Sequence, residues 1–321
     1  MKNKPILIVA GEPNSIFSEI FLKSISYKKF KSPLILIMSL NLFEKQMKFL
    51  NYKKKINLIE AKNLNKLKLN NKKINIINVE YKIHRTFEKI SNNSNLYINK
   101  CFEIAFEILK KKITNKLING PINKKHYLGN KYLGITEYIS RKFNINKNAM
   151  LIFNKDLAVC PLTTHLPLKL VSKNINKKII QQKIMLINEF YKKIIGFKPK
   201  IAITGLNPHC ESVDSFNEDE KIIKPTIKSL KKNDINIEGP ISADTIFLKH
   251  NRRKYDVIVG MYHDQVLTPI KTLFEYDAIN ITLGLPFLRV SPDHGPNENM
   301  VRSNSSNPLS LIRAFEFLDN K

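Results

Sequence analysis

The chain has 321 residues, hydrophobic residues make up 43% of it, and the excess of lysine and arginine gives a formal net charge of +27. This length is enough for two α/β lobes or for one large domain with a divided core, and the apolar fraction excludes wholesale disorder. Apolar runs stay below the roughly 20 residues that a membrane-spanning helix needs, and Cys101, Cys160 and Cys210 are too widely spaced for a disulfide framework. We therefore expect a globular cytoplasmic protein without a membrane segment.

The positive charge comes almost entirely from lysine, which is scattered among asparagine and isoleucine residues. A basic protein can bind nucleic acid, but no basic run interleaved with aromatic residues occurs here. A positive field also attracts small anionic ligands such as a phosphorylated substrate or a dinucleotide. We expect no nucleic-acid partner, and a nucleic-acid-binding protein stays as the alternative from another functional class. Such a protein would bind DNA or RNA in a strongly salt-dependent way, and chelators would not abolish the binding.

Short apolar runs, rich in Ile, Val and Leu and bounded by turn residues, alternate with amphipathic stretches. Strands are expected at residues 6–10, 34–39, 74–79, 117–119, 150–153, 157–160, 201–204, 257–260 and 278–283. Helices are expected at residues 97–112, 175–190, 218–232 and 309–318, where apolar residues recur on one helical face. This alternation predicts an α/β fold with a largely parallel sheet.

Histidines follow three of the expected strands within a few residues. The segments are TTHLPL with His165, GLNPH with His209 and MYHDQ with His263. Because the loops beyond the carboxyl ends of parallel strands line one crevice, three strands of one sheet could bring three imidazoles together. Three histidine ligands leave an open coordination position on a catalytic divalent ion, and Asp264 could orient a ligand or act as a base. The alternative interpretation is three unrelated loop histidines.

Two further clusters could hold anionic groups. Lys271, Asn280 and Arg289 surround an apolar segment, and a lysine, an amide and an arginine can bind a phosphate and a carboxylate. The alternative interpretation is that these three residues are ordinary charged and polar residues at the rim of the protein surface. The sequence SPDHGPN at 291–297 could wrap a cofactor, but the first expected strand is not followed by GxGxxG and no Walker A lysine motif occurs. A dinucleotide would therefore not be held in the Rossmann manner.

Together these segments resemble the 4-hydroxythreonine-4-phosphate dehydrogenases of vitamin B6 biosynthesis. The resemblance runs through nearly the whole chain and is strongest from Gly120 to Gly295. The matching motifs, in order, are GEP at 11–13, GP at 120–121, TTHLPL at 163–168, GLNPH at 205–209, GP at 239–240, ADT at 243–245, MYHDQ at 261–265, NITLGLPF at 280–287 and DHG at 293–295.

The resemblance implies the fold of isocitrate and isopropylmalate dehydrogenases, an α/β fold with two α/β/α lobes and a cleft between them. On this basis we expect a first lobe of residues 1–117 plus 265–321, which carries the cofactor loop. The second lobe, residues 118–264, would carry the metal histidines and the interface of a homodimer with shared active sites.

The same resemblance implies a role for each matching residue. The expected metal ligands, drawn from both subunits, are His165, His209 and His263, and the ion is zinc, cobalt or magnesium. The expected substrate contacts are Thr136, Lys271, Asn280 and Arg289. The residues expected in catalysis are Asp244, Asp264 and Lys271. The residues expected to bind the cofactor, NAD or NADP, are Asp293, His294, Gly295 and Asn307.

The implied reaction is the NAD-dependent oxidation of the 3-hydroxyl of 4-phosphohydroxy-L-threonine, after which the 3-oxo acid loses carbon dioxide to give 3-amino-2-oxopropyl phosphate. The chain departs from the family pattern Gly-His-Thr-Glu, which here reads Gly-Ile-Thr-Glu at 134–137. The missing histidine normally contacts the substrate, and Ile135 cannot donate a hydrogen bond. A dehydrogenase of another four-carbon phosphosugar acid, threonate or erythronate 4-phosphate, is therefore a second hypothesis.

Overall fold

The computed structural model describes residues 3–129, 132, 134–213 and 216–321. The chain divides into two compact units, Met1–Ile139 with Pro286–Lys321 and Ser140–Leu285. The expected lobes, residues 1–117 plus 265–321 and residues 118–264, divide the chain at other positions. The difference arises because helix α10 (His263–Phe274) and strand β11 (Ile279–Leu283) pack within the second unit.

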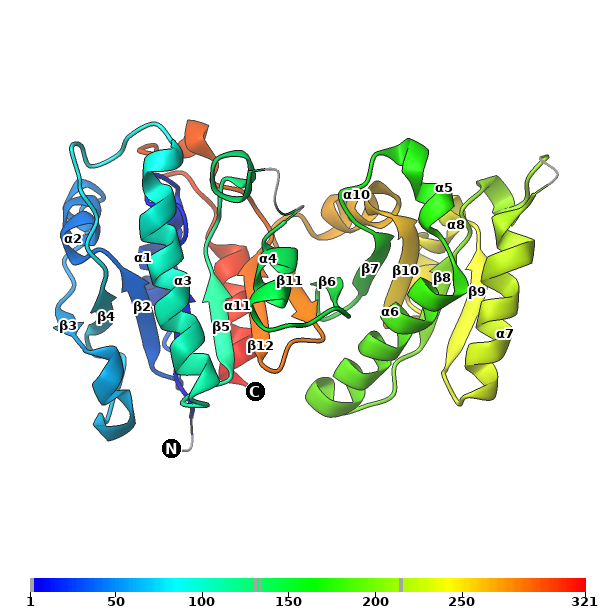
Figure 1. Ribbon diagram of the computed structural model, residues 1–321, viewed down its shortest axis with the longest axis horizontal. Coiled ribbons are helices and arrows are strands. Elements are labelled where there is room, and N and C mark those ends of the chain that lie inside the picture. The colour runs from blue at the N-terminus through cyan, green and yellow to red at the C-terminus, as the bar shows by residue number, and fades with distance from the viewer. Residues whose placement is uncertain (1–2, 130–131, 133, 214–215) are drawn as a thin grey trace. The chain divides into compact units, whose positions relative to one another are not determined.

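The first unit is built on a parallel sheet (Figure 1). Its strands are β1 (Ile6–Val9), β2 (Leu34–Met38), β3 (Ile56–Leu58), β4 (Ile74–Asn78), β5 (Lys116–Asn119) and β12 (Leu288–Pro292). They lie in the order β3-β4-β2-β1-β5-β12, and each pair of neighbours is parallel. Strands β1 and β2 are buried along their whole length and contain only Ile, Leu, Val and Met, as expected for parallel strands covered on both faces.

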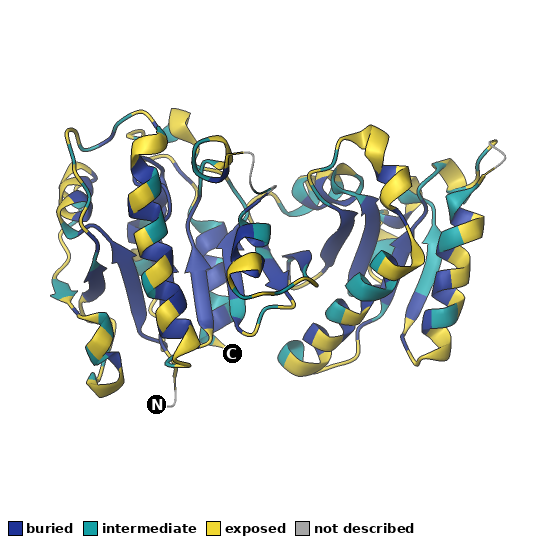
Figure 2. Cartoon of the chain, in the orientation of Figure 1, coloured by how far each residue is buried: buried dark blue, intermediate teal, exposed yellow. Residues whose placement is uncertain are grey.

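Amphipathic helices cover this sheet, and Figure 2 shows their buried faces as dark blue bands. They are α1 (Phe17–Tyr27), α2 (Leu40–Phe49), α3 (Asn95–Lys110) and α11 (Leu309–Asp319), and α4 (Ile135–Lys142) crosses the division between the units. The ring of Phe21 in α1 packs against Phe43 of α2 and Phe315 of α11, with centroids 6.0 and 6.2 Å apart. One buried aromatic side chain therefore joins three helices.

The second unit is built on a mixed sheet. Its strands are β6 (Ala149–Phe153), β7 (Ala158–Thr163), β8 (Ile201–Thr204), β9 (Ile237–Ile241), β10 (Val257–Tyr262) and β11. They lie in the order β11-β6-β7-β10-β8-β9, and β6 is antiparallel to both of its neighbours. Strands β7, β10, β8 and β9 are parallel, so their carboxyl ends meet at one edge.

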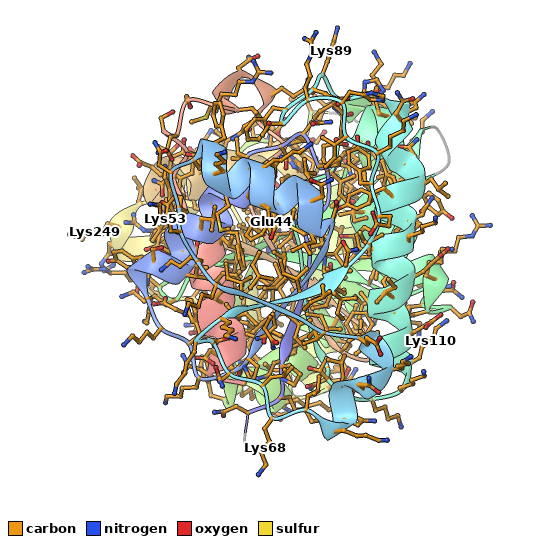
Figure 3. The ribbon with its side chains drawn as sticks, turned by 90° about the vertical axis from the view of Figure 1, so that its left-hand side faces the viewer. Glu44, Lys53, Lys68, Lys89, Lys110 and Lys249 are labelled. Carbon is orange, nitrogen blue, oxygen red and sulfur yellow. The ribbon has the colours of Figure 1, made fainter. Side chains whose placement is uncertain are left out.

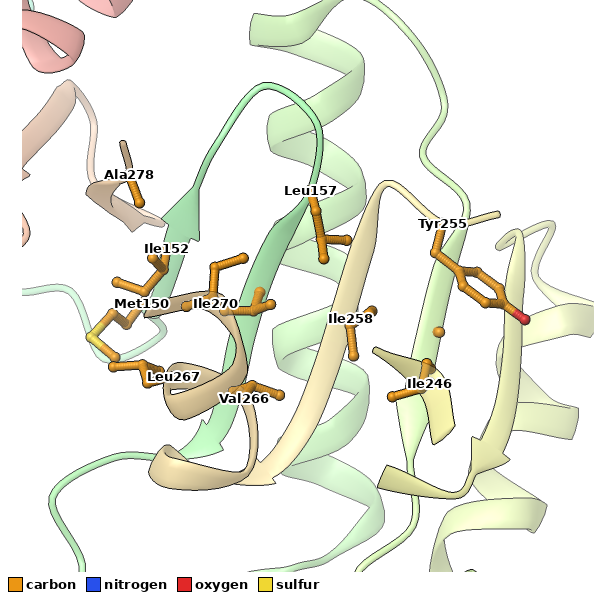
Figure 4. Packing of buried hydrophobic residues seen from close by; sticks show 12 residues of the cluster. Met150, Ile152, Leu157, Ile246, Tyr255, Ile258, Val266, Leu267, Ile270 and Ala278 are labelled. Carbon is orange, nitrogen blue, oxygen red and sulfur yellow. The ribbon is translucent and has the colours of Figure 1, made fainter. Parts of the chain in front are cut away.

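The helices of the second unit are α5 (Val171–Asn174), α6 (Lys177–Phe190), α7 (Lys224–Lys232), α8 (Ala243–Ile246), α9 (Lys249–Arg252) and α10. Val266, Leu267 and Ile270 of α10 belong to one hydrophobic cluster with Ile152 of β6 and Ile258 of β10 (Figure 4). Burying such a side chain contributes about 1.5–3 kcal/mol. This cluster therefore anchors the helix that begins at His263.

Short helical turns complete the chain. The 3-10 helices are Ala61–Lys66, Asn92–Ser94, Leu168–Leu170, Pro208–Cys210 and Glu298–Met300, and the π-helical turns are Lys124–Leu128, Tyr191–Ile195 and Asp219–Ile223. Across the described ranges, no helix has both the length and the apolar character needed to cross a membrane. In Figure 3 the labelled lysines Lys53, Lys68, Lys89 and Lys110 point outward in different directions, so these positive charges are spread over the surface.

The expected strands are confirmed, with bounds that shift by at most three residues, and the expected helices correspond to α3, α6, α7 and α11. Among the elements that the sequence did not predict are β3, β9, α1, α2 and α10. Strand β9 contains Gly239 and Pro240, which are unusual within strands. Helix α10 follows β10 without a loop and opens with the polar residues His263, Asp264 and Gln265, where the sequence predicts a loop.

Candidate active site

The three histidine segments lie at the carboxyl ends of neighbouring parallel strands in the second unit. Strands β7, β10 and β8 are adjacent in that order, and each is followed by one of the histidines. His165 lies two residues beyond β7, His263 is the first residue of α10 directly after β10, and His209 lies five residues beyond β8. The parallel arrangement therefore brings the three segments to one edge of one sheet.

His165 and His263 form a ring pair, with centroids 6.0 Å apart and planes inclined by 39°. Both rings are accessible, and the side chain of His263 is 38% exposed. The Nδ1 atom of His263 lies 2.6 Å from Oδ1 of Asp264. A proton on Nδ1 is therefore held by the carboxylate, which leaves Nε2 with the lone pair that a metal ligand requires.

His209 lies in a short, unusual turn. Its φ is +54°, and the following Cys210 has a φ of +62°. His165 has a φ of +53°. Left-handed backbone at residues other than glycine costs about 1 kcal/mol or more and is concentrated at functional sites, where the surrounding structure maintains it. The strain falls on two of the three segments that the sequence singled out.

Within the described ranges of this single chain, no three His, Cys, Asp or Glu side chains are close enough to hold a metal ion. The chain pairs His165 with His263, and His209 does not complete a cluster with them. The residues present fit a divalent ion in their chemistry, because two accessible imidazoles lie close together and one has its tautomer fixed by a carboxylate.

Lys271 and Asn280 lie in the same unit as the histidines. Lys271 is in the last turn of α10, two turns beyond His263, and is partly buried. Asn280 is in β11, and its Oδ1 atom is buried without a hydrogen-bond partner among the described residues. An unsatisfied buried acceptor costs roughly 1–3 kcal/mol, so Asn280 has a capacity that the donor of a ligand could use.

Arg289 and Thr136, the other expected substrate contacts, meet in the first unit. Arg289 is fully buried in β12, its Nε donates to Oδ1 of Asn119 over 2.7 Å, and one terminal nitrogen lies 3.5 Å from Oγ1 of Thr136. Burial lowers the pKa of Arg289 to about 10, and the nearby Glu137 carboxylate opposes that shift. The guanidinium therefore keeps its positive charge at neutral pH, deep in the unit.

Asn119 and Glu137 are residues of this cluster that the sequence analysis did not single out. Asn119 ends β5 just before Gly120, and Glu137 is the last residue of the Gly-Ile-Thr-Glu motif. A polar residue at the end of an otherwise apolar strand was the available signal for Asn119. Ile135, which stands where the family pattern has histidine, begins α4 and is partly buried.

The expected cofactor segment begins at the end of β12. The backbone N–H of Asp293 donates to Oγ of Ser310 over 2.9 Å, and Nδ1 of His294 lies 3.0 Å from the carbonyl oxygen of Gly295. A methyl group added at Gly295 would meet open space. Asn307 accepts the N–H of Leu309 through Oδ1 at 2.9 Å, so part of its role is to start α11.

The segment is tied to α1 at its far end. Both carboxylate oxygens of Glu19 accept hydrogen bonds from Ser306, one from its N–H over 2.6 Å and one from its Oγ over 3.0 Å. Lys23 donates to the carbonyl oxygens of Asn304 and Ser306 over 2.8 and 3.0 Å. Both ends of the segment are therefore fixed, whereas Gly295 lies in its open part.

Asp244, expected in catalysis, lies exposed in the first turn of α8. Burial raises the pKa of the Cys210 thiol, and the carboxylates of Asp219 and Asp244 add to that effect. Asp244 is therefore close enough to the turn of His209 to act on it electrostatically.

The chain is similar to known proteins over nearly its whole length. The family model described as Pyridoxal phosphate biosynthetic protein PdxA matches residues 29–318. A curated 4-hydroxythreonine-4-phosphate dehydrogenase from Sulfurihydrogenibium sp. (strain YO3AOP1) is 36% identical over 317 residues, which cover 97% of this chain and 96% of the relative. A D-threonate 4-phosphate dehydrogenase from Salmonella typhimurium (strain LT2) is 29% identical over 302 residues, 92% of each chain.

Solved structures show the fold of the chain. A 4-hydroxythreonine-4-phosphate dehydrogenase from Klebsiella pneumoniae superposes with a TM-score of 0.84 at 24% identity and covers 98% of each chain. Isocitrate dehydrogenase from Methylococcus capsulatus gives a TM-score of 0.51 at 9% identity, over 98% of this chain and 84% of that one. The expected isocitrate-dehydrogenase-like α/β fold is confirmed. The expected family is confirmed as well, and the chain belongs to the PdxA family as a dehydrogenase.

Proposed function

We propose that this dehydrogenase oxidises 4-phosphohydroxy-L-threonine with NAD in the biosynthesis of pyridoxal 5'-phosphate. A hydride leaves C3 for the nicotinamide ring, the proton of the 3-hydroxyl goes to a base, and a 3-oxo acid results. That acid loses its carboxyl group as carbon dioxide and gains a proton at C2, which gives 3-amino-2-oxopropyl phosphate. The observation that carries the proposal is the pair of His165 and His263, with His263 oriented by Asp264, at the carboxyl edge of the sheet.

The metal would be held by His165 and His263 of one chain and by His209 of a second copy. A shared site is supported by the failure of His209 to join the pair within the described part of one chain. Leu168 and Leu170, which follow His165, are 69% and 37% exposed and would be covered by a second subunit. When bound, a divalent ion supplies polarisation of the reacting oxygen and stabilises negative charge on it. Histidine ligation favours zinc or cobalt over magnesium.

The substrate has two anionic groups, and the chain offers matching cations. Arg289, whose charge is retained in spite of burial, and Lys271 suit the phosphate and the carboxylate. Asn280 and Thr136 add neutral hydrogen-bonding groups, and the free acceptor of Asn280 suits an ammonium or hydroxyl donor. These four residues would bind and orient the substrate.

Lys271, Asp264 and Asp244 would take part in catalysis. Lys271 is the group that we assign to proton transfer with the substrate, because an amine can give and take a proton at Nζ. Asp264 would keep the proton of His263 on Nδ1, and Asp244 would contribute negative charge near the turn of His209. Asp293, His294, Gly295 and Asn307 would line the site for NAD, with the open backbone at Gly295 allowing close approach.

A second candidate is oxidation of D-threonate or erythronate 4-phosphate, which carries a hydroxyl where the first substrate has an amino group. Two observations favour it. Ile135 replaces the histidine of the family pattern, and relatives of both names match this chain over most of its length. Turnover of the two substrates under identical conditions separates the candidates.

The alternative from another functional class is nucleic-acid binding. Such binding would survive chelation and weaken steeply with salt.

We place the enzyme in the cytoplasm, where its three free cysteines stay reduced. The test of the proposed function is NADH formation from 4-phosphohydroxy-L-threonine by metal-stripped protein, with Zn²⁺, Co²⁺ or Mg²⁺ added and with or without EDTA. Turnover that needs metal and is lost in His263→Ala supports the proposal. A folded protein that gives no turnover with any of these metals contradicts it, and activity on threonate 4-phosphate alone would establish the second candidate.

A further inference from the structure

The side chain of Gln265 bridges two of the histidine-bearing strands. Gln265 lies two residues beyond His263 in the first turn of α10. Its Oε1 atom accepts the N–H of Met261 over 2.7 Å and the Oγ1–H of Thr204 over 2.8 Å. Its Nε2 atom donates to the carbonyl oxygen of Gly205 over 2.8 Å. One amide therefore joins the end of β10, before His263, to the end of β8, before His209.

Further hydrogen bonds extend this connection to either side. Oγ1 of Thr163, at the end of β7 and two residues before His165, donates to the carbonyl oxygen of Met261 over 2.8 Å. The fully buried carboxylate of Asp219 accepts the N–H groups of Leu206 and Asn207 over 2.9 and 3.1 Å. We call the hydrogen bonds made by Thr163, Thr204, Gln265 and Asp219 the Gln265 network.

Two glycines leave the space that the network occupies. A Cβ atom at Gly260 would lie 2.4 Å from Cγ1 of Val266 and 3.1 Å from Oε1 of Gln265. A Cβ atom at Gly205 would lie 2.7 Å from Sγ of Cys210 and 2.8 Å from Oδ1 of Asp219. Residues with side chains at these positions would push α10 and the turn of His209 away from the strand ends. The close packing therefore requires glycine at both positions.

We propose that Gln265 is a positioning residue that sets His263 and His209 relative to the strands so that they can serve in a shared metal site. The proposal rests on the proposed function, in which these histidines bind a divalent ion. A glutamine side chain suits the role because it accepts and donates at once, whereas an ionised glutamate cannot donate to the carbonyl oxygen of Gly205. A methionine of similar length makes neither bond. Asp264 bonds the imidazole of His263 directly, whereas Gln265 bonds the backbone of Met261 and Gly205 and the hydroxyl of Thr204.

The test compares Gln265→Met with Gln46→Met. Gln46 in α2 is a buried glutamine that, like the partly buried Gln265, accepts from a hydroxyl and donates to backbone carbonyl oxygens; its partners are Ser18, Pro13 and Thr86, and it lies in the first unit. Both substitutions remove an amide that makes three hydrogen bonds within the protein, and both lower the Tm. Only Gln265→Met weakens binding of Co²⁺ to metal-stripped protein, by roughly ten- to a hundred-fold, and alters the visible spectrum of bound Co²⁺. Gln265→Glu does not restore the affinity.

The outcomes of Co²⁺ titration separate this inference from the proposed function. If the wild-type protein binds Co²⁺ and loses it in His263→Ala, but Gln265→Met binds with wild-type affinity and spectrum, the positioning role is wrong and the metal site stands. If Gln46→Met loses affinity as much as Gln265→Met, general destabilisation explains the effect and the inference is also wrong. A folded wild-type protein that binds no Co²⁺ overturns the proposed metal site and this inference with it.

Discussion

At the scale of single residues, Glu12 has an environment that opposes its charge. It lies just beyond β1, is 2% exposed, and accepts hydrogen bonds from Ser94 Oγ over 2.9 Å and from the N–H of Asn14 over 3.3 Å. Burial raises the pKa of Glu12 from 4.5 to about 7, although these hydrogen bonds lower it. The folded state therefore holds the proton more tightly than the unfolded state does. The free energy of unfolding therefore falls as pH rises from about 4.5 to about 7. Above that range the full destabilisation from the ionised, buried Glu12 is present.

Glu12→Gln is predicted to remove this pH-dependent cost. The quantity compared is the free energy of unfolding of the variant minus that of wild type. This difference is predicted to be up to about 3 kcal/mol more favourable to the variant at pH 8 than below pH 4.5, because the neutral amide does not have to ionise. Urea unfolding at both pH values measures the two differences. Glu107→Gln, at an exposed position on α3, is the control. Equal differences at both pH values would show that the Glu12 carboxyl is not perturbed by burial.

Ile135 gives a second prediction at the residue scale, because it stands where the family pattern has a substrate-contacting histidine. Ile135→His adds a donor and is predicted to raise kcat/KM for 4-phosphohydroxy-L-threonine by about ten-fold, the effect of one hydrogen bond to a charged group. Ile145→His, at another partly buried isoleucine, controls for histidine itself. A folded Ile135→His enzyme with unchanged kcat/KM for 4-phosphohydroxy-L-threonine and for threonate 4-phosphate would show that position 135 does not contact substrate.

At the scale of elements, the helices of the first unit depend on shared aromatic contacts. Phe21 is 1% exposed and packs against Phe17, Phe43 and Phe315, so Phe21→Ala leaves a cavity between α1, α2 and α11. We predict a loss of about 3–5 kcal/mol in the free energy of unfolding. Tyr27→Ala, on the same helix but 78% exposed, is predicted to change it by less than about 1 kcal/mol. Comparable losses in the two variants would contradict the packing described here.

Some elements could be predicted from the sequence because their pattern is local. Strands β1 and β2 are continuous apolar runs, and α3 repeats its apolar residues with helical spacing, so each is recognisable from its own residues. Helix α10 is not, because its first turn is polar and its apolar face is defined by contacts with β6 and β10. Strand β9 pairs with β8 in spite of Gly239 and Pro240, and that pairing is a long-range contact.

At the scale of the whole molecule, the sequence predicted the edge of the sheet at which His165, His209 and His263 lie. It did not predict Gln265, Asp219 or Glu12, since their partners are 60, 13 and 82 residues away in the chain and come together only on folding. Nor does the single chain bring three metal ligands together among the described residues. The proposed metal site therefore requires a second copy of the chain.

The most direct measurement mixes two inactive variants, His165→Ala and His209→Ala, co-folded in equal amounts and assayed for NADH formation from 4-phosphohydroxy-L-threonine with added Zn²⁺ or Co²⁺. If His165 and His263 come from one subunit and His209 from the other, one of the two sites in each mixed dimer is intact. We expect recovery of about a quarter of wild-type activity, since half of the dimers are mixed. No recovery beyond that of either variant alone, in dimers shown to be mixed, would contradict the assignment of His165 and His209 to different subunits of one site.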